Sequence, residues 1–303
     1  MARSALVPSS VSDPTGLDSL ERKALKDFAR RYKACLDAYL KMVNAIPFTQ
    51  FVVNATQYQF NLLPDELVNM IDSTNAIIDS VLMQGGRSSL WIFDSYIRPA
   101  YQRGTAQTYA NLSIQSTEYN TARPQLESVL FSDPYQRRLG LVRARQFELM
   151  QGLSADLKRE LAQTLTEGLG RGIGPLEISK NITERLDVSQ SRADRIARTE
   201  ISQAFKTARR GEADEAAQAF KFGYRMLHLS AMSPTTRPTH AHRNGTLHTS
   251  AEQATWYSQD GNAINCKCSE IEVLVDADGK PLSRTAIDQV KSRKLVYAGS
   301  DDE

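Results

Sequence analysis

The sequence predicts an α+β protein, with a mainly helical N-terminal two-thirds followed by a small α+β C-terminal module. Apolar residues recur at helical spacing in several long stretches as far as about Phe220. Beyond Phe220 the period changes to the alternation that is typical of strands. Hydrophobic residues make up 41% of the 303-residue chain and charged residues 24%, so the composition is that of an ordinary globular protein with ample material for a core.

The N-terminal part is predicted to be a tail and a helical domain. Residues 1–16 are rich in Ser, Pro and Ala, which indicates a flexible tail. Residues 17–150 form the helical domain, with helices expected over 17–44, 64–83 and 88–115. We expect this domain to supply a docking surface, for which its aromatic residues are candidate anchors, although they suit a core equally well. These aromatic residues are Trp91, Phe93, Tyr96 and Tyr101.

The middle of the chain has the clearest helical pattern. Leucine recurs every fourth residue from Leu153 to Leu169 and is followed by a glycine-rich turn over residues 168–175. A helix over 176–186 and a long helix over 187–220 are expected next. Glu200 lies on the apolar stripe of the long helix, so its carboxylate needs a partner or must be neutral.

The C-terminal module combines strands and turns. Alternation predicts strands over 222–228 and 266–275, and Asn244-Gly245 is a strong turn signal. We therefore expect an α+β module over residues 151–280, and a polar C-terminal tail or helix over 281–303.

Most of the histidines and cysteines lie in this module. The segment Thr236–Gly245 contains His240 and His242, His248 follows it, and Cys266 and Cys268 come about twenty residues later. Two cysteines one residue apart on a strand point to the same face. Thiolates and imidazoles are the preferred ligands of structural Zn²⁺, so His240, His242, Cys266 and Cys268 are candidate metal ligands, with His248 as a substitute.

Two other interpretations of the same residues stay open. His240 with Glu200 and Arg237 could be an acid–base site, as in a small nuclease or a zinc-dependent hydrolase that also uses Cys266 and Cys268. No established catalytic motif accompanies them, and we therefore expect no enzyme activity. The third interpretation is a buried polar clasp in which His240, Arg237 and Glu200 fasten a loop to a helix without catalysis and without a cofactor.

The ends of the chain and its cysteines indicate where the protein is made. The N-terminus has no apolar run of signal-peptide length, and no stretch is long enough to insert into a membrane. Three cysteines, two of them separated by a single residue, do not form a disulfide framework. We therefore expect folding in a reducing cytoplasm.

The charge distribution offers a weak indication of nucleic-acid binding. The net charge is only +2, with a mild basic surplus in residues 131–230. Candidate contacts to the DNA backbone are Arg137, Arg138, Arg143 and Arg145, although a solvated helix face explains them as well.

Four motifs in this order resemble a known family. They are Arg195-Ile-Ala-Arg198-Thr199-Glu200, Thr236-Arg-Pro-Thr-His240, Asn244-Gly245 and Asn265-Cys-Lys-Cys268. They are similar to the motifs of the phage Mu protein F-like family of minor head proteins. The resemblance implies that the polar clasp is formed by the residues of these family motifs, which are Arg198, Thr199, Glu200, Arg237, His240, Asn244 and Gly245.

The sequence departs from the family pattern at two places. Met232-Ser-Pro234 stands where relatives often carry an acidic residue, and Gly261-Asn-Ala-Ile264 stands where they often have a histidine. If that histidine binds a metal in relatives, its absence here counts against the zinc interpretation unless His242 or His248 substitutes for it.

The resemblance implies a minor capsid protein of a tailed bacteriophage, made in the host cytoplasm and located in the virion. Such a protein acts in head morphogenesis at the portal or in the head interior, and in genome packaging or ejection. Its implied partners are the portal protein, the major capsid protein or a scaffolding protein, with non-specific contact to packaged double-stranded DNA and no membrane insertion.

Overall fold

The computed structural model describes residues 3–53 and 55–299, and it confirms the predicted mainly helical α+β class. The chain forms two compact units, each built from segments that are distant in sequence. Unit 1 combines Met1–Arg22, Ser95–Val142 and Arg198–Glu303, and unit 2 combines Lys23–Asp94 and Arg143–Ala197. The domains predicted from the sequence are consecutive ranges of residues. The two units of the structure, in contrast, each combine segments that are distant in sequence.

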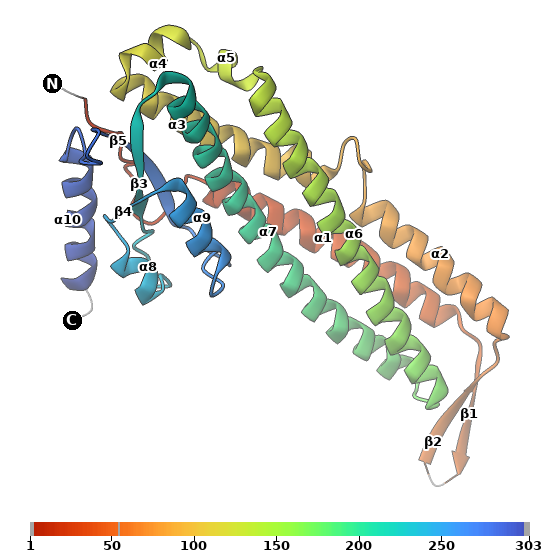
Figure 1. Ribbon diagram of the computed structural model, residues 1–303. Helices are drawn as coiled ribbons and strands as arrows, with labels where there is room; N and C mark the ends of the chain where they lie inside the picture. Colours follow the sequence, from red (N-terminus) through yellow and green to blue (C-terminus); the bar gives the residue numbers. More distant parts are fainter. Residues whose placement is uncertain (1–2, 54, 300–303) are drawn as a thin grey trace. The chain divides into compact units, whose positions relative to one another are not determined.

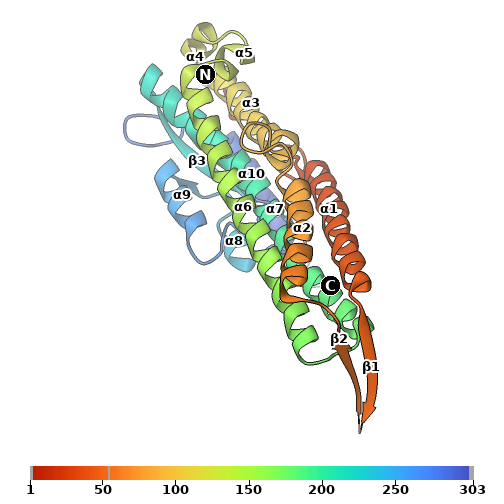
Figure 2. The same cartoon turned by 90° about the vertical axis from the view of Figure 1, so that its right-hand side faces the viewer.

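Unit 2 is a helical bundle made from α1, α2, α6 and α7, which lie side by side in Figures 1 and 2. Their bounds are α1 Asp18–Ala45, α2 Pro64–Leu82, α6 Asp133–Gly170 and α7 Pro175–Phe220, and the ends of α1, α6 and α7 belong to unit 1. The predicted leucine stripe is buried from Leu153 to Leu165, as expected for the core face of a helix.

The long helix of the middle region differs from the prediction. We expected a break between a helix over 176–186 and another from Asp187, but α7 continues through this point. Ser189, which could have capped a new helix, instead donates a hydrogen bond from Oγ to Glu160 Oε2 of α6 at 2.8 Å. Side-chain packing between the two helices therefore overrides the local start signal.

A β-hairpin in unit 2 was not predicted. Strands β1, Phe48–Val53, and β2, Ala55–Phe60, pair antiparallel, with Phe48 opposite Phe60. The backbone N–H of Tyr58 donates to the carbonyl of Gly172 at 3.1 Å, which attaches the hairpin to the turn between α6 and α7.

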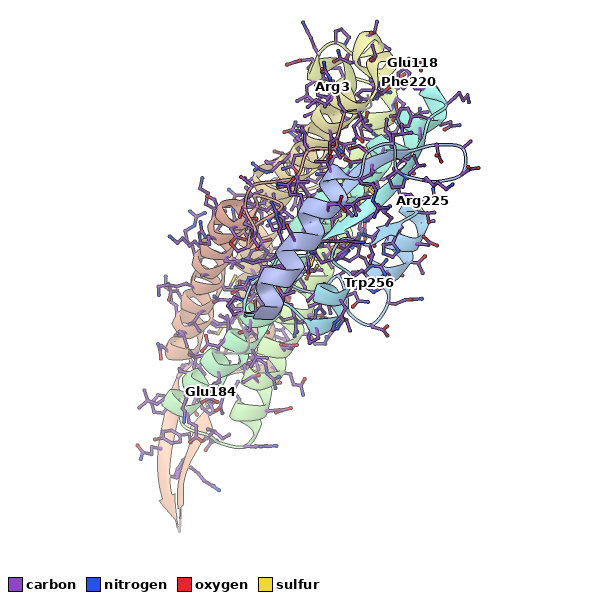
Figure 3. All side chains as sticks on the ribbon, turned by 90° about the vertical axis from the view of Figure 1, so that its left-hand side faces the viewer. Arg3, Glu118, Glu184, Phe220, Arg225 and Trp256 are labelled. Atoms are coloured by element: carbon purple, nitrogen blue, oxygen red, sulfur yellow. The ribbon has the colours of Figure 1, made fainter. Side chains whose placement is uncertain are left out.

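The remaining helical elements lie in or next to unit 1. The expected helix over 88–115 is divided: residues 93–97 form the π-helix η1, Phe93–Ile97, before α3, Arg98–Gln115. Two short helices follow, α4, Thr117–Ala122, and α5, Leu126–Leu130. Tyr119 of α4 packs edge-on against Phe220 (labelled in Figure 3) with ring centroids 5.5 Å apart.

The C-terminal module of unit 1 is a three-stranded antiparallel sheet in the order β4-β3-β5. Its strands are β3, Gly223–Leu229, β4, Leu247–His248, and β5, Ser269–Val275. The helices α8, Pro238–His242, and α9, Ser250–Ser258, lie in the connections, and α10, Thr285–Gly299, follows the sheet. The predicted strand over 222–228 is confirmed, and that over 266–275 begins three residues later than expected.

Both faces of the sheet are covered. Ile271 and Val273 of β5 face a core cluster that includes Ile287 and Val290 of α10. The alternate residues of β5 face α3 and α7, and Figure 1 shows the sheet between α10 and these two helices. As a result every residue of β5 is buried, the charged ones included.

The two predicted tails pack onto unit 1. In the N-terminal segment, Ala5 is buried, and the N–H of Leu6 donates to Asn111 Oδ1 at 2.8 Å. In the C-terminal range, Ala286, Ile287 and Val290 are buried on α10. Within the described residues both segments are therefore parts of the folded unit, since their apolar side chains cover one face of the sheet.

Of the two roles considered for the aromatic residues, docking anchor and core residue, the structure supports the core role. The exposed fraction is 9% or less for Trp91, Phe93, Tyr96 and Tyr101. Among the residues that the structure describes, no helix combines the length and apolar character needed to cross a membrane.

Candidate functional site: a buried histidine–cysteine cluster

Three of the four candidate metal ligands converge in unit 1. Nδ1 of His240 lies 3.4 Å from Sγ of Cys268 and 3.5 Å from Sγ of Cys266. The three ligand atoms lie within 4.8 Å of one another, and all three residues are buried. Nε2 of His240 is buried without a hydrogen-bond partner among the described residues, so Nδ1 is the ring nitrogen through which His240 acts.

The other two histidines of the segment have different surroundings. His242 is exposed, and its Nδ1 lies 2.7 Å from the carbonyl oxygen of Pro238. His248 lies on β4, where its Nε2 is 2.7 Å from Thr246 Oγ1. The cluster therefore contains His240, Cys266 and Cys268.

The cysteines lie just before β5 rather than on it, so strand alternation is not what brings their sulfurs together. Asn265 adopts a left-handed backbone conformation, with φ 51°, and its N–H donates to Thr199 Oγ1 at 3.2 Å. The carbonyl of Cys266 accepts from Ser202 Oγ at 2.6 Å and from Lys206 Nζ at 3.3 Å. Helix α7 thus fixes the backbone of the cysteine loop, and both sulfurs turn toward His240.

The thiols of the cluster have perturbed acidities. The hydrogen bond from Cys268 holds the pKa of the Cys266 thiol well below its usual range, and the nearby Lys206 charge lowers it further, against the opposing effect of burial. Lys206 is itself buried and lies 4.3 Å from the ring centroid of Tyr257. A buried positive charge next to a thiol favours the thiolate.

Arg237 binds the loop that precedes the two cysteines. Its guanidinium donates to the carbonyl oxygens of Gly261 and Asn262, each at 2.9 Å, and of Ile264 at 3.2 Å. These bonds tie the start of α8 to the loop that precedes the cysteines. The loop that ends at Ile264 is thus held through its backbone carbonyl groups.

Asn244 and Gly245 connect the turn after α8 to other elements. The side chain of Asn244 accepts from the N–H of Ser230 at 2.9 Å and donates to the carbonyl of Val290 at 2.8 Å. Gly245 has a φ of 76°, and an added Cβ would lie 2.6 Å from Lys291 Cγ. The turn therefore requires glycine at this position for both backbone and steric reasons.

The remaining motif residues lie on α7. Thr199 binds the cysteine loop as described above, Glu200 is buried, and Arg198 is exposed. Among the clasp residues of the sequence analysis, Thr199, Arg237 and Asn244 thus bind the cysteine loop, the loop before it and the turn after α8 at separate points.

A small cavity borders the cluster. It has a volume of about 60 Å³ and is lined by His240, Cys266 and Cys268, together with Thr236 and Arg237. A water molecule occupies about 30 Å³ in the liquid, so the cavity holds one or two waters and is too small for a nucleotide.

A layer of buried ion pairs between α7 and β5 was not predicted. Arg209 binds Glu272 through two hydrogen bonds, and Arg210 pairs with Glu270. Burial raises the pKa of Glu270. The only signals in the sequence were two glutamates at alternate positions of a strand and two arginines next to an alanine stripe.

The candidate DNA contacts differ in exposure and in their interaction partners. Arg138 forms ion pairs with Glu212 and Glu215, which neutralise its charge. Arg143 lies over the ring of Phe93 with its guanidinium carbon 5.0 Å from the centroid. Arg137 and Arg145 are exposed.

Comparison with known proteins agrees with the motifs. Residues 159–271 match the family model described as Phage Mu protein F like protein, and this segment contains the Ala-Arg-Thr-Glu part of α7, the His240 segment and the cysteine pair. No curated protein and no solved structure gives a significant match to the chain. The family comprises phage head morphogenesis proteins. Over residues 159–271, the chain is therefore similar to the Phage Mu protein F-like family, which supports the resemblance that the order of its motifs predicted.

Proposed function

We propose that this protein is a minor capsid component of a tailed-phage virion that acts without catalysis, through contact with the portal protein or with a capsid or scaffolding protein. In this role it supports head assembly and the passage of the genome into or out of the head. The family match over residues 159–271 is the observation that carries the proposal.

Exposed apolar side chains in unit 2 support a protein-binding role. Phe48 and Phe51 of the hairpin are 48% and 46% exposed, and Leu63 and Val68 next to it are 67% and 55% exposed. Exposed apolar side chains of this size are candidate contacts for a protein partner.

A groove beside the hairpin adds to this surface. It has a volume of about 620 Å³ and lies between β2, the start of α2 and the turn between α6 and α7. Its apolar lining consists of Tyr58, Phe60, Leu62, Leu67 and Leu169. A groove of this size accommodates a short peptide segment of a partner protein, so we assign docking to the hairpin and the groove.

Contact with packaged DNA is a secondary part of the proposal. Arg137 and Arg145 are the exposed members of the four candidate arginines. Arginines of this kind bind phosphates without reading sequence, which suits a protein that meets the genome during passage.

A hydrolase centred on Glu200, His240, Cys266 and Cys268 is the alternative function. The cavity beside the cluster, at about 60 Å³, is small for a phosphodiester substrate, and this favours the structural role.

Purified heads test the proposal. In a phage lacking a functional copy of this gene, heads complemented with the wild type should contain the protein, as measured by quantitative mass spectrometry before and after genome ejection. The double variant Phe48→Ser/Phe51→Ser should lower its copy number at least fivefold, whereas Gln50→Ser, an exposed polar change on the same strand, should not. Normal incorporation of the double variant would contradict docking through the hairpin, and absence of the wild type from heads would contradict the function itself.

A further inference from the structure

In unit 1, the buried Nδ1 of His240 lies at a metal-binding distance from each of the two cysteine sulfurs. For Zn–S bonds of about 2.3 Å and Zn–N bonds of about 2.0 Å, tetrahedral angles place a nitrogen and a sulfur about 3.5 Å apart. The corresponding distances from His240 Nδ1 are 3.4 Å to Cys268 and 3.5 Å to Cys266. Both nitrogen–sulfur distances are thus those of ligands that share one ion.

The fold holds these ligands from several sides. His240 lies on α8, whose start is bound by Arg237 to the loop before the cysteines. Ser202 and Lys206 of α7 hold the carbonyl of Cys266. Ligands positioned by such surrounding contacts bind a metal with little loss of entropy.

The chemistry of the donor set selects the ion. Two thiolates and one imidazole suit Zn²⁺, whereas Mg²⁺ and Ca²⁺ prefer oxygen ligands. Two thiolates also balance the charge of the ion, so the buried centre is neutral once loaded.

A water molecule in the small cavity can supply the fourth ligand of the metal ion. The cavity borders all three ligand residues and has room for one or two waters, so a water can take the fourth tetrahedral position.

We propose that His240, Cys266 and Cys268 bind one Zn²⁺ ion through Nδ1 and the two Sγ atoms, with water as the fourth ligand. The ion cross-links α8 to the loop before β5 and stabilises the module that carries the family motifs. The site is independent of the docking surface on the hairpin.

Metal analysis tests this proposal. The full-length protein, expressed with added zinc and purified without chelator, should contain about one zinc per chain by inductively coupled plasma mass spectrometry. Cys266→Ser, Cys268→Ser and His240→Gln should each reduce the zinc content at least tenfold.

Two matched variants serve as controls. Cys35 is a buried free cysteine on α1, and His242 lies two residues from His240, so Cys35→Ser and His242→Gln should keep the zinc of the wild type. Loss of zinc in His242→Gln would overturn the assignment of ligands, and a wild-type zinc content below about one in ten chains would overturn the site.

Cobalt substitution gives a readout on the wild type, independent of the folding of any variant. The Co²⁺-loaded protein should show thiolate-to-cobalt charge-transfer absorption and the intense visible bands of a tetrahedral ion. Weak octahedral bands without charge transfer would contradict ligation by the cysteines. Zinc with hydrolysis of DNA or RNA that is lost in His240→Gln would support the metal site but contradict its purely structural role.

Discussion

Arg209 of α7 and Glu272 of β5 form a bidentate ion pair inside unit 1. Nε lies 3.0 Å from Oε1 and Nη2 lies 2.5 Å from Oε2, with side-chain exposures of 2% and 0%. Thr108 Oγ1 and Asn111 Nδ2 of α3 also donate to this carboxylate, at 2.8 Å and 2.7 Å. One glutamate therefore joins the sheet to two helices.

Breaking this pair should be costly because it leaves a buried charge without its partner. We expect Arg209→Met and Glu272→Leu each to lower the free energy of unfolding by about 3–5 kcal/mol, and the double variant to be destabilised by clearly less than the sum. Urea denaturation measures all three. Lys33→Met, which removes an exposed pair with Asp37, is the control and should cost less than about 1 kcal/mol. Additive effects would show that the two residues do not act as a pair.

Glu21 should make stability depend on pH. Burial raises the pKa of Glu21 from 4.5 to about 7, so the folded state binds its proton more tightly than the unfolded state does. Its contribution is thus fully present below about pH 4.5 and is lost as the pH rises through 7.

The variant Glu21→Gln keeps the neutral form at every pH. At pH 8 we expect it to be more stable than the wild type by up to about 3 kcal/mol, at 1.36 kcal/mol per pKa unit, and to match the wild type at pH 4.5. Thermal or urea unfolding across this range measures the difference. Glu184→Gln, on an exposed part of α7 (Figure 3), should change stability by less than about 0.5 kcal/mol throughout. A constant difference between Glu21→Gln and the wild type would contradict the raised pKa.

Gly104 allows α3 to approach α7 closely in unit 1. An added Cβ would lie 2.3 Å from the carbonyl oxygen of Phe205 and 3.1 Å from Cβ of Ala208. Gly104→Ala should therefore destabilise the protein by about 1–3 kcal/mol, because helix backbone must move. Gly140→Ala, where an added Cβ meets nothing within 4 Å, should instead stabilise helix α6 by about 0.5–1 kcal/mol. Equal effects of the two changes in urea denaturation would contradict the close approach of the helices.

Asn244 should contribute strongly to the stability of the C-terminal module. Asn244→Leu removes the partners of two buried backbone groups, on Ser230 and Val290, and should cost about 2–4 kcal/mol. Asn61→Leu, which removes an exposed hydrogen bond to Thr49, should cost less than about 1 kcal/mol. Amide hydrogen exchange at β3 should accelerate in the first variant only.

DNA binding should involve Arg137 and Arg145 but not Arg138. The double variant Arg137→Gln/Arg145→Gln should weaken non-specific binding to duplex DNA and reduce the slope of log K against log salt by about 2, because each of the two arginines neutralises one phosphate. Arg138→Gln should leave the slope unchanged and instead reduce stability, because Glu212 and Glu215 lose their partner. Fluorescence anisotropy at several salt concentrations measures the slope, and an unchanged slope in the double variant would remove DNA binding from the proposed function.

Local sequence patterns were sufficient to predict elements whose conformation depends mainly on their own residues. The leucine repeat from Leu153 predicted a buried helix face, alternation after Phe222 predicted β3, and Asn244-Gly245 predicted a turn. The motif order also predicted the family that the match over 159–271 confirms. Each of these signals depends on side-chain period or backbone preference, which short segments carry by themselves.

Local patterns failed where a distant segment changes the environment. The start signal at Asp187 was overridden by packing between α6 and α7, and the aromatic residues near Trp91 belong to the core rather than the surface. The hairpin at Phe48 is joined by a backbone hydrogen bond to Gly172, more than a hundred residues away in sequence. A side chain is buried only when other residues pack against it, and those residues often come from distant parts of the sequence.

The sequence by itself determined the class of fold, the main helices, the strand after Phe222 and the family. Only the tertiary structure decided that Glu272 is buried against Arg209 and that Cys266 and Cys268 meet His240 rather than His242. Helical and strand periods are set by neighbours in sequence, whereas charge pairing and ligand geometry require atoms from different elements to meet within a few ångströms. Such meetings depend on how the elements pack, which no local pattern specifies.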